Sequence, residues 1–252
     1  MKRYLKYLEH IKKREASTIK VYRSILREFS QYEPLTRKSW SKYLEKISGN
    51  SRKTQKLKLT VVKNYLNWKA DRGYITHKER FWNDAEPPKS RDLPRYLTAH
   101  ELRLLLSTVD DPYYRSLFRL LINTGMRISE LLRLREDDIT FDGEKARIRI
   151  RGKGNKERMI TIDRSIVESA QKNGVFEKKV SARTIERKIK EYARLAGINK
   201  KVTPHTLRHS FAVMLVERGT LVNAVQSLLG HETLTTTGIY LKISATYVPN
   251  LV

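Results

Sequence analysis

The pattern of apolar positions predicts about four amphipathic helices in the first 80 residues. Apolar and aromatic residues recur there every three to four positions, which is the spacing of a helix with one buried face. Ser17 is predicted to cap the second helix, and Gly49 and Gly73 follow the third and fourth. The four predicted faces are Tyr4, Leu8 and Ile11; Ile19, Tyr22, Leu26 and Phe29; Trp40, Tyr43, Leu44 and Ile47; and Leu57, Val61, Tyr65 and Trp68.

The helical pattern ends at the proline-rich and charged segment DAEPPKSRDLPRY, residues 84–96. Prolines lack a backbone donor and disfavour helix in the residue before them, so this composition predicts an extended linker. We therefore expect a helical domain over residues 1–86, a linker over 87–95 and a second domain over 96–252.

The second domain begins with clear helix signals. Thr98 and Glu101 form a capping-box pattern, and Asp111 precedes a helix with Pro112 at its first position and Gly125 at its end. Further helices are predicted over SARTIERKIKEYARLAG, TPHTLRHSFAVMLVERG and LVNAVQSLLG.

The period changes over residues 138–162. KARIRIRG places Ala146, Ile148 and Ile150 on one face of a strand, with arginines on the other, and RMITID predicts a further strand. With GKGNKE as a turn, these segments predict a small antiparallel sheet in a chain that is otherwise mostly α.

The charge balance predicts a polyanionic partner. The formal net charge is +25, of which +15 lies in residues 1–95 and +10 in 96–252. Repulsion among so many positive charges costs stability, and a polyanionic partner such as nucleic acid explains why they are present. Since both halves are basic, we expect the binding surface to extend over both. Any one of these basic side chains can instead be an ordinary solvent-exposed residue with no role in binding. The candidate contacts are Lys53, Lys56, Lys63, Arg147, Arg149, Arg151 and Lys156.

Several classes of protein are disfavoured. The chain has no cysteine, which excludes disulfides, thiolate metal sites and a cysteine nucleophile. It has no apolar run near 18 residues, and its N-terminus is too polar for a signal peptide. We therefore expect a cytoplasmic protein with no membrane partner.

TPHTLRH, residues 203–209, is the first stretch whose side chains could bind a ligand or take part in a reaction. Thr203 suits an N-cap and Pro204 the first helical position, so His205 and Arg208 share a face near the helix start. Such a site can bind an oxyanion, although both can also be ordinary surface residues. A metal site through His205 and His209 is weakly supported, because the glutamate of the zinc-protease motif is missing.

Two further segments carry charged candidates. NTGMRISEL places Arg127 just beyond a glycine, with Glu130 three residues later. GKGNKER places Lys153 between Gly152 and Gly154 at a hairpin tip, where glycines allow a close approach to a partner. Considered alone, the first segment can simply hold an Arg–Glu ion pair, and the second can simply be a basic turn.

The segment GHETLTTTGIY brackets four threonines and Gly238 between His231 and Tyr240. Threonine and glycine commit weakly to helix, so this segment is either a frayed edge of the fold or one in which Tyr240 has to move. Together with the arginines and the lysine, a tyrosine suits attack on a phosphodiester without a divalent metal. Guanidinium groups can hold the non-bridging oxygens while negative charge develops on them.

TGMRISEL, GKGNKER, HTLRH and LLGHETLTTTGIY resemble the motifs of the tyrosine recombinase (phage integrase) family, and most closely those of its Xer-type members. The resemblance covers about residues 97–245, and the N-terminal half is similar only in layout. It implies that Tyr240 is the nucleophile and forms a 3′-phosphotyrosyl link. The other implied roles are phosphate binding by Arg127 and Arg208, protonation of the leaving 5′ oxygen by Lys153, handling of the tyrosine proton by His205, a phosphate bond from His231, and support from Glu130.

The resemblance further implies a two-domain DNA clamp that cleaves and rejoins strands at a double-stranded recombination site, with no metal or other cofactor. It implies a monomer in solution and a homo-tetramer on DNA, although the tail LKISATYVPNLV is shorter than the docking helix usual in relatives. Chromosome or plasmid dimer resolution and integration of a mobile element both remain open. The alternatives are a monomeric tyrosine topoisomerase and a binding-only relative.

Overall fold

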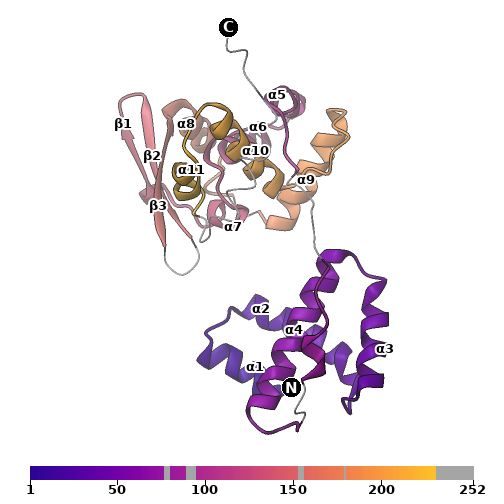
Figure 1. Cartoon of the computed structure of the whole chain (residues 1–252). Helices are drawn as coiled ribbons and strands as arrows, with labels where there is room; N and C mark the ends of the chain where they lie inside the picture. Colours follow the sequence, from indigo (N-terminus) through magenta and orange to yellow (C-terminus); the bar gives the residue numbers. More distant parts are fainter. Residues whose placement is uncertain (77–79, 89–94, 153–155, 179, 231–252) are drawn as a thin grey trace. The chain divides into compact units, whose positions relative to one another are not determined.

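The computed structural model divides into two compact units, residues 1–92 and 93–252. The division falls inside the segment predicted as a linker, most of which lies outside the described residues. Each unit has its own apolar core and is considered by itself (Figure 1). The structure describes residues 1–76, 80–88, 95–152, 156–178 and 180–230.

The first unit is helical, as predicted. Its core is strongly aromatic, with the rings of Phe29 and Tyr43 edge to face at 5.0 Å and Trp40 beside both. Such pairs add to the stabilisation from burial alone. The elements are α1 (Lys2–Lys6), the π-helical turn η1 (Tyr7–Ile11), α2 (Ala16–Phe29), the 3₁₀ turn η2 (Ser30–Tyr32), α3 (Arg37–Ser48), α4 (Arg52–Asp71) and the 3₁₀ turn η3 (Phe81–Asn83).

Three details of the predicted helices are wrong. Ile11 is exposed, because the wider π-helical turn rotates it away from the face of Tyr4 and Leu8. Leu57 is exposed at the edge of the buried stripe of α4. Ser17 lies inside α2, which begins one residue earlier without any side-chain cap.

The second unit is built mainly of helices. Thr98, Asp111 and Thr203 cap α5, α6 and α10 through their side chains, which confirms the predicted helix starts. No helix in the described parts of the chain is both long and apolar enough to cross a bilayer. The helices are α5 (Ala99–Thr108), α6 (Pro112–Thr124), α7 (Ile128–Leu131), the 3₁₀ turn η4 (Glu136–Asp138), α8 (Arg164–Lys172), α9 (Ala182–Leu195), α10 (Pro204–Glu217) and α11 (Val222–Leu229).

A three-stranded antiparallel sheet lies along one side of this unit, in the order β1 (Ile139–Asp142), β2 (Lys145–Arg151) and β3 (Glu157–Asp163) (Figure 1). The alternation predicted for β2 is confirmed, since its alanine and isoleucines are buried. Helices α6, α8 and α11 contact the sheet. The first strand and α8 were not predicted individually.

Candidate active site

The site begins where α6 ends. Gly125 adopts a left-handed conformation (φ 57°), and a Cβ there would lie 2.3 Å from the ring of Phe211. Only glycine therefore lets α6 stop this close to α10. Immediately afterwards Arg127 becomes the N-cap of α7, so the turn carries the arginine to the face where α10 presents Arg208.

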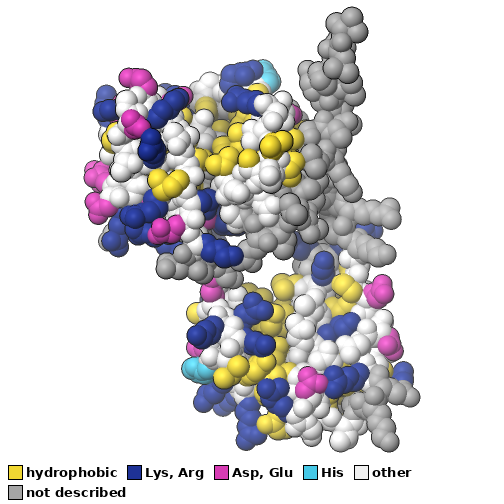
Figure 2. Space-filling view, turned by 60° about the vertical axis from the view of Figure 1, so that its left-hand side comes forward, with side chains coloured by type: hydrophobic (Ala, Val, Ile, Leu, Met, Phe, Trp, Pro, Cys, Tyr) yellow, Lys and Arg dark blue, Asp and Glu magenta, His cyan; other side chains and the backbone are white. Residues whose placement is uncertain are grey.

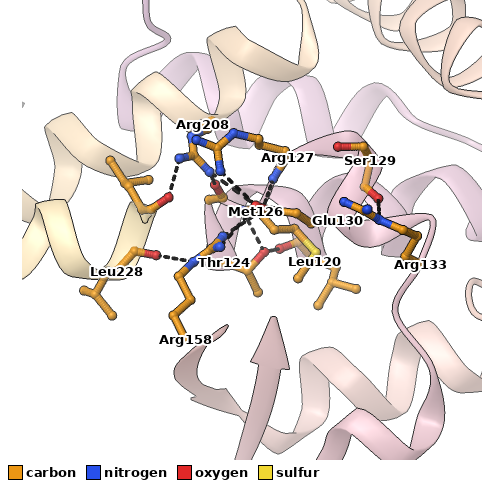
Figure 3. Close-up of polar contacts among 12 residues, drawn as sticks. Leu120, Thr124, Met126, Arg127, Ser129, Glu130, Arg133, Arg158, Arg208 and Leu228 are labelled. Atoms are coloured by element: carbon orange, nitrogen blue, oxygen red, sulfur yellow. Dashed lines mark hydrogen bonds and ion pairs between the residues drawn. The ribbon is translucent and has the colours of Figure 1, made fainter. Parts of the chain in front are cut away.

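Glu130 is the centre of the site (Figure 3). Its buried carboxylate accepts hydrogen bonds from the Arg127 backbone at 2.7 Å and from Arg127 Nη1 at 2.8 Å. It also accepts two from Arg158, Nη1 at 3.1 Å and Nη2 at 2.7 Å. Burial alone would raise the pKa of this carboxyl, but the bonds from Arg158 and Arg127 outweigh burial and lower it to about 2.

Arg208 is buried on the first turns of α10. Its Nη1 donates to the carbonyl of Gly125 at 2.7 Å, and its Nη2 donates to the carbonyl of Leu229 at the end of α11. The same Nη1 lies 3.9 Å from Glu130 Oε2. These contacts hold the Arg208 guanidinium near that of Arg127, at the same carboxylate.

Sequence reasoning missed Arg158. It lies on β3 with the same alternation as Ile160 and Ile162, so it faces the core, and it is mostly buried. A buried arginine on the apolar face of a strand needs a negatively charged partner. RMITID carries this signal, because its first residue, Arg158, shares a face with Ile160 and Ile162. Besides Glu130, Arg158 Nε donates to the carbonyl of Leu228 at 2.7 Å.

The described residues therefore place three guanidinium groups around one carboxylate. Three positive charges against one negative charge leave a surplus that is partly shielded from water. Such a site attracts an anion strongly, because the effective dielectric constant is lower than in bulk water. A phosphate group has the charge and the acceptor geometry that guanidinium forks prefer.

Lys153, His231 and Tyr240 lie outside the described residues, but the residues before two of them border the cluster. A Cβ on Gly152, which precedes Lys153, would lie 3.7 Å from Glu130 Oε1. A Cβ on Gly230, which precedes His231, would lie 3.4 Å from Arg158 Nη1.

The two histidines of α10 differ in environment. His205 is exposed in the first turn, whereas His209 is partly buried one turn later. Burial, with smaller contributions from His205 and Arg208, lowers the pKa of His209 to about 4. At neutral pH His209 is therefore uncharged beside the arginines.

Candidate nucleic-acid contacts on the first unit lie on or beside α4. Lys53 and Lys56 are exposed, whereas Lys63 donates to the carbonyls of Asn83 and Ala85 at 2.9 and 3.0 Å and ties η3 to α4. Figure 2 shows Lys and Arg side chains spread over the visible faces of both units.

The arginines of β2 are engaged by acids. Arg147 pairs with Asp142, Arg149 lies 3.2 Å from Asp138, and Arg151 lies 2.8 Å from Asp138 and 3.4 Å from Glu157. Lys156 is exposed just after the turn. Whether these side chains bind DNA stays a prediction.

The comparisons with known proteins agree with the site. The model of the phage integrase family matches residues 95–246. Tyrosine recombinase XerA of Pyrococcus furiosus is 34% identical, over 100% of this chain and 92% of the relative.

Two solved structures share the fold. The XerH site-specific recombinase bound to palindromic difH substrate, a post-cleavage complex, gives a TM-score of 0.76 at 21% identity, over 97% of this chain and 82% of that one. A lambda integrase tetramer bound to a Holliday junction gives 0.77 at 20% identity, over 93% and 76%.

Proposed function

Since the chain belongs to the phage integrase family and is an Xer-type tyrosine recombinase that cleaves and rejoins DNA, we propose that the cluster around Glu130 binds the scissile phosphate. The observation that carries this proposal is the surplus of guanidinium groups over carboxylates. Arg127 and Arg208 bind the non-bridging oxygens and stabilise the charge that develops on them in the transition state.

In the proposed reaction the hydroxyl oxygen of Tyr240 attacks phosphorus, and the bond from phosphorus to the 5′ oxygen breaks. His205 accepts the proton of the tyrosine, and Lys153 donates a proton to the leaving 5′ oxygen. His231 donates a hydrogen bond to the phosphate. The product is a 3′-phosphotyrosyl link, and attack by another 5′ hydroxyl reverses these transfers and reseals the strand.

Glu130 supports the site in this proposal. Its carboxylate, whose pKa the bonds from Arg158 and Arg127 lower to about 2, is ionised at neutral pH, orients Arg127 and reduces repulsion among the guanidinium groups. Its hydrogen-bond donors among the described residues are Arg127 and Arg158.

We further propose that the units at 1–92 and 93–252 are the helical DNA-binding and the catalytic parts of a clamp. The net charge of +15 in residues 1–95 supports this assignment. The protein is a monomer in solution and forms a tetramer on two DNA sites, supported by the tetrameric relative on a Holliday junction. Its substrate places it with the DNA, in the cytoplasm.

The test is Tyr240→Phe in the full chain, with a nicked DNA substrate that traps the covalent intermediate. We expect unchanged DNA affinity and a complete loss of the protein–DNA adduct, because the ring remains but the nucleophilic oxygen is gone. An adduct that persists in this variant would assign the nucleophile to another of the thirteen tyrosines.

A further inference from the structure

Arg158 connects three segments that are distant in the sequence. From β3 it reaches the Glu130 carboxylate, 28 residues away, through a two-pronged pair. Its Nε reaches the carbonyl of Leu228 in α11, 70 residues away. A Cβ on Gly152, at the end of β2, would lie 3.9 Å from Arg158 Nη1, and one on Gly230, at the end of α11, would lie 3.4 Å from it.

Most of the N–H donors of Arg158 bond protein groups. Three of the five N–H donors of its guanidinium make these bonds, and its side chain is only 10% exposed. By contrast, the Arg127 side chain is 35% exposed. Arg127 is therefore placed to meet a substrate. Arg158 is assigned a holding role because its bonds join β3 to Glu130 and to α11, and not because it is buried, since Arg208 is only 4% exposed.

These segments lead to reacting groups of the proposed reaction. The β2–β3 turn begins at Gly152 and carries Lys153, and the chain beyond Gly230 carries His231 and Tyr240. A backbone bond from Gly152 N to Lys156 O, 2.7 Å long, closes the base of that turn directly beside the Glu130 carboxylate. Arg158, two residues after Lys156 in the sequence, thus bonds the Glu130 carboxylate next to the base of the turn.

We infer that Arg158 is a positioning residue, which keeps the base of the lysine-bearing turn and the end of α11 in register with Glu130 and the phosphate-binding arginines. This inference rests on the proposed function. Proton transfer and in-line attack both depend on placement, and a shift of about 1 Å can cost on the order of 10²-fold in rate. Loss of Arg158 should therefore impair protonation of the leaving group first, because Gly152 is separated from Lys153 by a single bond along the chain.

The experiment compares two DNA substrates in full-length protein. One has the ordinary bridging 5′ oxygen, and the other has sulfur there, which leaves as a thiolate without a proton. Single-turnover adduct formation is measured at saturating protein for wild type, Arg158→Ala and Arg158→Lys. The control is Arg164→Ala, which removes a half-exposed arginine paired with Glu168 at 2.7 Å in the same unit.

We expect Arg158→Ala to slow cleavage of ordinary DNA by about 10²-fold, within the range that general acid catalysis supplies. Sulfur should restore its rate to within about tenfold of wild type, with DNA affinity changed less than about threefold. Arg158→Lys keeps the positive charge but loses the two-pronged pair with Glu130, so its cleavage rate on ordinary DNA should lie between those of wild type and Arg158→Ala. Arg164→Ala should match wild type on both substrates.

Two outcomes would overturn the inference. Equal slowing of Arg158→Ala on both substrates, with the unfolded fraction accounted for by circular dichroism, would reduce Arg158 to a structural residue or a phosphate contact. Wild-type rates in Arg158→Lys and Arg158→Ala would remove any role. If instead wild type forms no adduct on either substrate, the proposed function itself fails.

Discussion

Two carboxylates of the second unit each hold several arginines, yet their surroundings differ. Glu130 and Asp138 are both buried, with side chains 1% and 3% exposed. The partners of Glu130 include Arg208 at 4%, whereas Arg151, a partner of Asp138, is 45% exposed. One cluster is enclosed by α10, α11 and β3, and the other lies on the outer face of the sheet.

Their charge balance differs as well. Around Glu130 three arginines share one carboxylate, while Arg149 and Arg151 are matched by Asp138 and Glu157. Of these two clusters, counted over the described residues, the one around Glu130 has more arginines than carboxylates. A basic composition alone does not separate the two, because both contribute arginines to the same net charge.

Replacing one arginine by lysine in each cluster should give the largest difference, which is in the rate of DNA cleavage. Arg208→Lys loses the fork that holds the carbonyls of Gly125 and Leu229, and we expect adduct formation to fall by about 10²- to 10³-fold. Arg149→Lys should stay within about threefold of wild type. The measurement is single-turnover cleavage at saturating protein, and an equal loss in Arg149→Lys would place the sheet face at the scissile phosphate.

Removal of the charge at each carboxylate should separate the clusters by stability. Glu130→Gln removes the carboxylate that the described residues place among three guanidinium groups, so we expect it to lower the free energy of unfolding by about 3–5 kcal/mol. Asp138→Asn should cost about 1–2 kcal/mol, because its arginines can turn toward water.

Urea unfolding followed by circular dichroism measures both values. All three tryptophans (Trp40, Trp68 and Trp82) lie in the first unit, so their fluorescence is an internal control that should not shift. Added phosphate should stabilise Glu130→Gln more than wild type, since it supplies the missing negative charge. A similar cost at both carboxylates would mean that enclosure does not distinguish the clusters.

Salt dependence should give a smaller contrast, between exposed lysines of α4 and the paired arginines of β2. Each lysine that contacts DNA phosphate should contribute about 0.9 to the slope of log affinity against log salt. We expect Lys53→Ala with Lys56→Ala to reduce the slope by about 1–2. Arg147→Ala with Arg149→Ala should reduce it by less than about 1, because each arginine already has a carboxylate partner.

Fluorescence anisotropy of labelled DNA across a salt series gives both slopes. If the arginine pair has the larger effect, the carboxylates must release the arginines when DNA binds, and the sheet face then belongs to the DNA-binding surface.

Local signals were the part of the fold that sequence predicted well. Thr98, Asp111 and Thr203 cap helices through neighbours within three residues, and β2 alternates strictly. The sequence did not indicate α8, since its nine residues follow a strand directly and the side chain of its N-cap, Asp163, makes no capping hydrogen bond. Short elements of this kind depend on tertiary packing more than on their own pattern.

The site was predictable only in its motif residues. Motif spacing pointed to Arg127 and Arg208, which the structure brings together at Glu130. Arg158 lies at the end of GKGNKER, but the motif alone does not indicate its role, because its partners are 28 and 70 residues away. Long-range ion pairs leave no periodic trace in a sequence, apart from a charged residue at an apolar position of a strand.

The smallest predicted effect is a pH dependence confined to the cationic cluster. His209 has a folded pKa of about 4 and an ordinary unfolded value near 6.5, because burial and the adjacent His205 and Arg208 disfavour its charged form. Between these two values the unfolded chain binds a proton that the folded chain does not. Stability from this residue is therefore complete above about pH 6.5 and falls as the pH drops toward 4.

His209→Asn should remove this loss without adding a charge. Between pH 7 and pH 5 we expect wild type to lose about 1–2 kcal/mol more than the variant, after allowance for the partial exposure of the ring. Only the difference between the two pH values is compared, so any cost of the substitution at pH 7 cancels. Urea unfolding by circular dichroism at both pH values gives this difference.

The sheet cluster around Asp138 has no histidine among its ion-pair partners in the described residues, so Asp138→Asn should leave the difference unchanged. An equal loss in wild type and His209→Asn would show that the ring gains its proton in the folded state, and that the Glu130 cluster tolerates a further positive charge.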